Sequence, residues 1–167
     1  MIIHLLIYLS LSHGAPSMAF VKNLAQDMVQ VYQEELGIIL EPTIIPTRIH
    51  YKPATLSSWL GQYNSMSRAV RQRAGRLNVR GLGLRILILG PIQDGSRLYM
   101  AGATGPGCRL RANVSVLYLG EVNADGASRY WQDLEVMNHE LGHQLGAGHD
   151  NNLPATVMHY AANMYLS

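Results

Sequence analysis

The sequence is poor in cysteine and, through its middle, in acidic residues. Cys108 is the only cysteine among 167 residues, so no disulfide can form within the chain and packing has to hold the fold. No stretch reaches the roughly 20 apolar residues that a membrane-spanning helix needs, so we expect no membrane span. With 48% apolar residues, 14% charged residues and a formal charge of +2, the chain is neither a disordered polymer nor a polyelectrolyte.

Acidic residues are absent from position 42 to position 93, whereas cations are frequent there. The cations of this basic segment are Arg48, Lys52, Arg68, Arg71, Arg73, Arg76, Arg80 and Arg85. A solvated basic face explains them, and a patch for nucleic acid is the alternative. The segment lacks the interleaved aromatic residues of a single-strand binding groove, which favours the first interpretation.

The opening, MIIHLLIYLSLSHGAPS, has two interpretations. Its apolar run followed by small residues resembles a signal peptide, but the basic residues that begin such peptides are missing. The run is only about nine residues long and ends at Ser-His-Gly, which is typical of a buried strand. We therefore expect a first strand here.

Strands and helices alternate along the rest of the chain. Ser17 and Gly37 bracket an amphipathic helix, and a β-rich stretch follows whose Pro42 and Pro46 indicate a bend or a sheet edge. Residues 55–75 are expected to be helical, and residues 84–90, the GSRLYMAG stretch (95–102) and residues 113–120 to contain strands. A last helix, starting near Asp125 or Ser128, is expected to bury Trp131, Leu134, Met137, Leu141 and Leu145. This order predicts an α/β fold in a single domain.

The last helix carries HELGHQLGAGHD, residues 139–150. His139 and His143 are one helical turn apart and can face one metal ion. Gly146 can take the positive φ that ends the helix, so that the chain turns and His149 becomes a third ligand. Three histidines leave one position open for water, which is the pattern of a catalytic zinc site, and Glu140 is placed to act as general base.

These residues resemble the metzincin clan of zinc metalloendopeptidases, whose motif HExxHxxGxxHD matches His139, Glu140, His143, Gly146, His149 and Asp150. The Asp after the third histidine is similar to that of the adamalysin (reprolysin) branch. The resemblance implies an α/β (α+β) fold with a twisted, mixed five-stranded sheet, long helices and one catalytic Zn²⁺. It also implies a peptide substrate that lies extended along an edge strand, for which GSRLYMAG is the candidate.

Metzincins place a methionine in a tight turn under the metal, and Met158 in ATVMHY resembles that Met-turn. The spacing from His149 is closer to the matrixins, and the tyrosine of MHY makes Tyr160, as in astacins, a candidate for contact with the metal or the transition state. The resemblance implies one catalytic domain, 1–167, made of an N-terminal subdomain, 1–146, and a short C-terminal subdomain, 147–167.

The sequence thus predicts a monomeric, zinc-dependent endopeptidase with Glu140 as general base. The family resemblance favours a secreted protein, although the chain shows no clear signal peptide and has one cysteine where adamalysins have disulfides. Two alternatives stay open: a catalytically idle zinc-binding module for adhesion or delivery, and a nucleic-acid-binding protein that uses the basic segment from 48 to 85.

Overall fold

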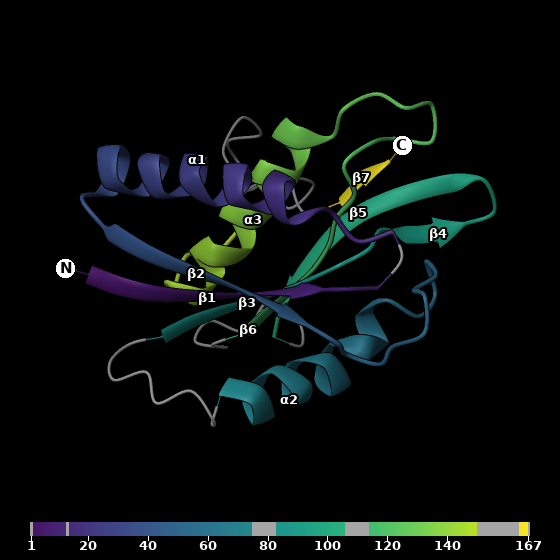
Figure 1. Ribbon diagram of the computed structural model, residues 1–167, viewed down its shortest axis with the longest axis horizontal. Coiled ribbons are helices and arrows are strands. Elements are labelled where there is room, and N and C mark those ends of the chain that lie inside the picture. Colours follow the sequence, from purple (N-terminus) through teal and green to yellow (C-terminus); the bar gives the residue numbers. More distant parts are fainter. Residues whose placement is uncertain (1, 13, 75–82, 106–113, 150–163, 167) are drawn as a thin grey trace.

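The protein has a mixed α/β fold, and within the described residues three α-helices pack on one sheet (Figure 1). The structure is a computed structural model that describes residues 2–12, 14–74, 83–105, 114–149 and 164–166. None of the helices in these ranges is long and apolar enough to cross a membrane.

Seven strands form the sheet within the described residues. Their bounds are β1 Ile2–Ser10, β2 Ile39–Thr47, β3 Gly83–Leu89, β4 Ile92–Asp94, β5 Arg97–Thr104, β6 Val114–Tyr118 and β7 Met164–Leu166. The order is β2-β1-β3-β6-β5-β4, with β7 paired to β5. The first four strands in this order are parallel, and β5 is antiparallel to β6. The expected mixed sheet of five strands is therefore present, and the short strands β4 and β7 extend it.

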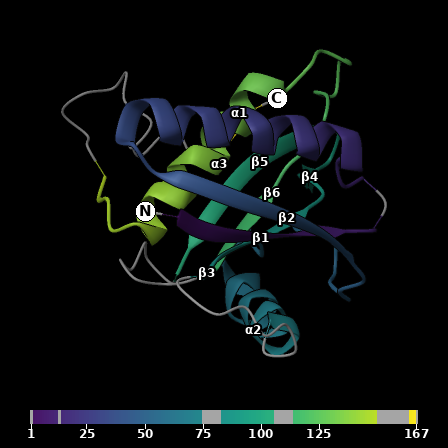
Figure 2. The same cartoon turned by 60° about the vertical axis from the view of Figure 1, so that its left-hand side comes forward.

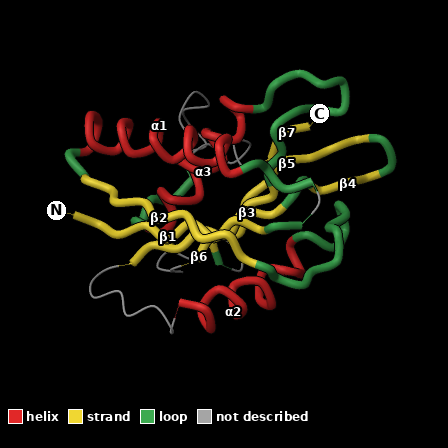
Figure 3. Tube along the Cα trace, in the orientation of Figure 1, coloured by secondary structure: helices red, strands yellow, loops and turns green. Residues whose placement is uncertain are grey.

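The helices cover both faces of the sheet. Helices α1 (Met18–Leu36) and α3 (Tyr130–Gln144) lie on one face, and α2 (Tyr63–Ala74) lies on the other, as Figures 2 and 3 show from two directions. A 3₁₀ turn, η1 (Leu60–Gln62), leads into α2. The expected helix over 55–75 therefore begins later, because residues 56–59 form a turn.

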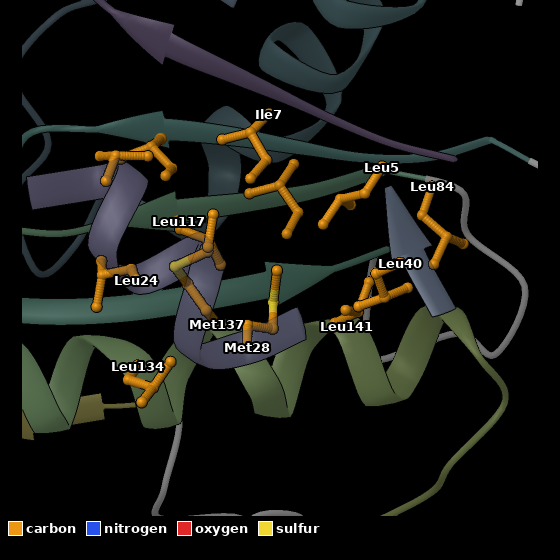
Figure 4. Packing of buried hydrophobic residues seen from close by; sticks show 14 of the residues in the cluster. Leu5, Ile7, Leu24, Met28, Leu40, Leu84, Leu117, Leu134, Met137 and Leu141 are labelled. Carbon is orange, nitrogen blue, oxygen red and sulfur yellow. The ribbon is translucent and has the colours of Figure 1, made fainter. Parts of the chain in front are cut away.

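Each face of the sheet has its own apolar core, which explains the continuous apolar runs in the sequence. Along β1, Leu5 and Ile7 face α1 and α3, whereas Leu6 and Tyr8 belong to the core under α2. Side chains alternate between the two faces of a strand, so a strand covered on both sides has to be apolar throughout. Figure 4 shows the core of the first face, where side chains of both helices meet those of the strands.

The predicted features of the first half are confirmed. Residues 2–10 form the expected first strand. The Ser17 hydroxyl accepts a hydrogen bond from the Phe20 amide at the start of α1, and Gly37 ends the helix with φ 64°. The prolines of β2 lie on an edge strand, where a missing amide donor costs no ladder hydrogen bond.

The expected buried position of Trp131 is wrong, since this side chain is 70% exposed. Helix α3 begins at Tyr130, later than the sequence predicted. Tyr130 is four residues before Leu134, so it takes the inward place, where its ring packs edge-on against Phe20 at 5.6 Å. Trp131 follows about 100° further round the helix and faces solvent.

The two edges of strand β5 pair with different strands. Tyr99 pairs with both Ile92 of β4 and Leu166 of β7, while Ala101 pairs with both Tyr118 of β6 and Met164 of β7. Strands β4 and β6 thus share one edge, and β7 takes the outer edge over Tyr99–Ala101. Over the next three residues, up to Thr104, no described strand pairs with the outer edge.

Candidate metal centre

Three histidine side chains converge at the end of α3. The Nε2 atoms of His139 and His143 are 3.0 Å apart. Nε2 of His149 lies 3.2 Å from that of His139 and 3.1 Å from that of His143. His139 and His143 are fully buried, and His149 is partly buried. The three nitrogens therefore form a nearly equilateral triangle in a largely desolvated place.

This triangle fits a tetrahedral metal ion. Zinc binds imidazole nitrogen at about 2.0–2.1 Å, so neighbouring ligands of a tetrahedral site are roughly 3.3 Å apart. The three sides, 3.0–3.2 Å, lie close to that value. Nδ1 of His143 is 2.8 Å from the Ala147 carbonyl oxygen, which can only accept, so Nδ1 carries the proton and Nε2 of the neutral ring offers its lone pair to a metal.

The turn after α3 brings His149 to the other two histidines. Gly146 has φ 98°, a conformation that L side chains rarely adopt. The Ala147 amide donates to the Gly142 carbonyl and the Gly146 amide to the His143 carbonyl, which together form a Schellman motif. The structure thus shows the turn that the sequence predicted at Gly146.

Glu140 is buried between α3 and β5. Its side chain has no exposed surface, and Oε2 accepts a hydrogen bond of 2.5 Å from the Thr104 hydroxyl. Burial raises the pKa of Glu140 to about 7, against the opposing effect of the Thr104 hydrogen bond. Its other oxygen, Oε1, has no hydrogen-bond partner among the described residues. A water molecule held at the histidines is the kind of group that such a buried acceptor requires.

Four further residues near Glu140, namely Gly102, Thr104, Ser115 and Gln144, were not predicted as site residues from the sequence. A Cβ on Gly102 would lie 2.5 Å from Glu140 Cγ, so the carboxylate side chain lies directly over this glycine. Thr104 donates a hydrogen bond to Glu140, Ser115 is hydrogen-bonded to Thr104, and Gln144 donates to Ser115. Ser115 and Thr104 are 25 and 36 residues away along the chain, and no local pattern marks them.

Three predicted residues lie outside the described part of the chain. These are Asp150, Met158 and Tyr160, with the Met-turn to which the last two were assigned. Their roles stay predictions.

A separate cavity of about 910 Å³ opens at the carboxyl ends of the parallel strands. Ser10, Arg48 and Gly90 line it, at the ends of β1, β2 and β3. None of the three histidines, nor Glu140, is among its lining residues, so the histidine cluster is not part of it.

Comparison with known proteins gives a similarity of fold. No protein-family model matches the chain, and no curated protein matches its sequence. Among solved structures, metalloproteinase-II from Bacteroides fragilis matches with a TM-score of 0.59 and 13% sequence identity. The match covers 95% of this chain but 46% of the other, so this chain spans less than half the length of that protein. The fold is thus similar to that of a metalloproteinase, and three histidines lie within metal-binding distance of one another.

Proposed function

We propose that the protein is a zinc-dependent endopeptidase in which His139, His143 and His149 hold the metal. The convergence of the three Nε2 atoms carries the proposal. Three nitrogen ligands leave a fourth position for water, which distinguishes a catalytic zinc site from a structural one.

Glu140 acts as the general base. Zinc bound at the histidines would lower the pKa of a water molecule toward about 7 and polarise the carbonyl of the scissile peptide bond. Glu140 Oε1 takes the proton of the attacking water while the water oxygen bonds to the carbonyl carbon. When the C–N bond breaks, the same oxygen gives that proton to the leaving amine.

The peptide substrate lies extended along the outer edge of β5, but further along the strand than the predicted GSRLYMAG stretch, of which it keeps only Gly102. Strand β7 already pairs over Tyr99–Ala101, so the substrate takes the part of the edge from Gly102 to Thr104. Gly102 and Thr104, at the two ends of this part, lie against Glu140. Pairing by β-augmentation at this edge would bring the scissile bond to the general base.

The finer assignment also belongs to the proposal. We assign the chain to the metzincins and, by the Asp after the third histidine, to their adamalysin branch. The chain is then one catalytic domain, with subdomains 1–146 and 147–167, in which Met158 packs under the metal.

The test is hydrolysis of an unstructured protein by the zinc-loaded chain and by Glu140→Gln. The amide can still hold water but cannot take its proton, and a general base contributes about 10²–10⁴-fold, so we expect kcat to fall at least about a hundredfold with zinc content unchanged. The matched control is Glu135→Gln on the same helix, which should keep normal turnover. Chelation should abolish hydrolysis and added zinc should restore it.

The idle zinc-binding module predicts zinc binding without any hydrolysis by the wild-type chain, and the same experiment detects this outcome. The nucleic-acid alternative predicts salt-dependent binding to DNA. One cation of the basic segment is used within the fold, because Arg73 donates to the Thr47 hydroxyl and to the Arg48 carbonyl.

A further inference from the structure

We infer that Thr104 is a positioning residue for the general base, and that Ser115 and Gln144 fix the direction of its hydrogen bond. The four side chains form one connected series from β3 to the Glu140 carboxylate. The inference rests on the proposed function, since it assigns a role to the orientation of Glu140.

The series begins with an amide whose orientation is determined. The Arg85 backbone amide donates to Gln144 Oε1 at 3.2 Å, and Gln144 Nε2 donates to the Arg85 carbonyl at 2.8 Å. This two-fold pairing with one backbone residue distinguishes the oxygen of the Gln144 amide from its nitrogen. The second hydrogen of Nε2 is then directed to Ser115 Oγ, 2.7 Å away.

The hydroxyl groups of Ser115 and Thr104 continue the same donor-to-acceptor direction. Ser115 Oγ accepts from Gln144, so its own proton is available to Thr104 Oγ1 at 2.7 Å, a shorter contact than the 3.4 Å to the Glu140 carbonyl. Thr104 Oγ1 accepts that proton and donates its own to Glu140 Oε2 at 2.5 Å, a shorter contact than the 3.1 Å to the Glu140 carbonyl. Each hydroxyl accepts one hydrogen bond and donates one, and the carboxylate accepts the last.

Packing completes the positioning. The place of a Cβ on Gly102 is 2.5 Å from Glu140 Cγ and 2.9 Å from Leu117 Cδ2, so the Glu140 side chain occupies the space that this glycine leaves. Thr104 holds Oε2 from the same strand. Of the two carboxylate oxygens, Oε1 is therefore the one left to meet the attacking water.

The experiment begins with Thr104→Val, which removes the hydroxyl and keeps the shape, and Thr104→Ser, which keeps the hydroxyl. Without the Thr104 hydroxyl, the Glu140 carboxylate loses its alignment, and a small misplacement of a catalytic group lowers the rate strongly. We therefore expect Thr104→Val to lower kcat at least about tenfold, with KM within about twofold of wild type. Thr104→Ser should restore kcat to within about threefold of wild type. Thr47→Val is the matched control: this threonine is also buried, but it lies on β2, which three strands separate from β5, and the kcat of this variant should not change.

A second measurement does not depend on activity. The unfolding of wild type, Thr104→Val, Glu140→Ala and the double variant is followed in urea with chelator present at pH 8. A hydrogen bond to a charged group stabilises the folded state, so the Thr104 and Glu140 substitutions should be coupled. We expect a coupling of roughly 10- to 100-fold in the unfolding equilibrium constant. If Thr104→Val does not fold, Ser115→Ala replaces it in both measurements, because it removes the donor to Thr104.

The outcomes separate this inference from the proposed function. Normal kcat in Thr104→Val, an equal loss in Thr104→Ser, or a coupling below about twofold would each overturn the role of Thr104. If the zinc-loaded wild-type chain hydrolyses no peptide, the proposed function fails, and the coupling alone decides whether Thr104 holds the Glu140 carboxylate.

Discussion

Gly102→Ala is the substitution that tests most directly how Glu140 is packed. The added methyl carbon would lie 2.5 Å from Glu140 Cγ, 2.9 Å from Leu117 Cδ2 and 3.0 Å from Glu140 Cδ. Carbon atoms in contact are normally about 3.5–4.0 Å apart, so the methyl group and Glu140 have to separate by roughly 1 Å. The φ angle of Gly102 is not in the positive range, so the alanine backbone itself is not strained.

The size of the effect of Gly102→Ala depends on which neighbouring side chains can move away from the new methyl group. Overpacking a buried site costs about 1–3 kcal/mol, and a chain of this size loses roughly 2–4 °C in Tm per kcal/mol, so we expect Tm to fall by roughly 2–12 °C. Leu117 can change rotamer, but Glu140 is tied at Oε2, and its displacement moves the general base. Gly102→Ala should therefore also lower kcat, by up to about a hundredfold if the carboxylate moves by 1 Å.

Thermal unfolding and steady-state hydrolysis measure the two effects. Gly83→Ala is the matched control, because Gly83 is also in a strand but a Cβ there meets nothing within 4 Å. Adding Glu140→Ala to Gly102→Ala should restore most of the lost stability, since the clashing side chain is gone. Unchanged Tm and kcat in Gly102→Ala, or strictly additive losses in the double variant, would refute this description of the packing.

Two further predictions concern the metal and the pH. His149→Ala should lose bound zinc in metal analysis, whereas His50→Ala, which alters a histidine outside the cluster, should keep it; undiminished zinc in His149→Ala would remove His149 from the site. In metal-free protein, the pKa of Glu140 is raised by burial from 4.5 to about 7, so the folded state keeps a proton that the unfolded chain releases. The Glu140 contribution to stability should thus fall by at most about 3 kcal/mol as pH rises from 4.5 to 7. The Glu140→Gln variant should lack this loss of stability. Burial also raises the pKa of Asp133, to about 8, but Asp133 affects both proteins equally. Identical slopes of unfolding free energy against pH in wild type and Glu140→Gln, measured by urea unfolding, would contradict the prediction.

The sequence was sufficient where a local pattern has one physical solution. Ser17 and Gly37 predicted both ends of α1, because each supplies a specific cap. The two prolines of β2 predicted a bend or a sheet edge, since they cannot donate to a ladder, and β2 is an edge strand. The spacing of the three histidines predicted their convergence, because helix geometry and one turn at Gly146 bring them together.

Sequence reasoning failed where two local solutions compete or where the partner is remote. Tyr130 and Trp131 are adjacent aromatic residues, four and three residues before Leu134, so helical spacing alone allowed either to face the core; Tyr130 does so and Trp131 is exposed. Thr104 and Ser115 read as ordinary strand residues, because their role depends on the pairing of β5 with β6 beneath Glu140. The pairing of β7 with β5 joins segments more than 60 residues apart, and a three-residue strand gives no periodic signal.

The second half of α3 shows how the fold and the proposed chemistry depend on each other. Five polar side chains are buried there, although a buried helix is normally apolar all round: Asn138, His139, Glu140, His143 and Gln144. Leaving a buried polar group without a partner costs about 1–3 kcal/mol, so such a helix requires specific bonds to each group. Gln144 meets this requirement with Arg85 and Ser115, and Glu140 meets half of it with Thr104. Among these five side chains, Asn138 Oδ1 and Glu140 Oε1 have no hydrogen-bond partner within the described residues. A metal ion with a water ligand is the group whose charge and geometry match three converging imidazole nitrogens and a buried carboxylate on the residue after the first of them.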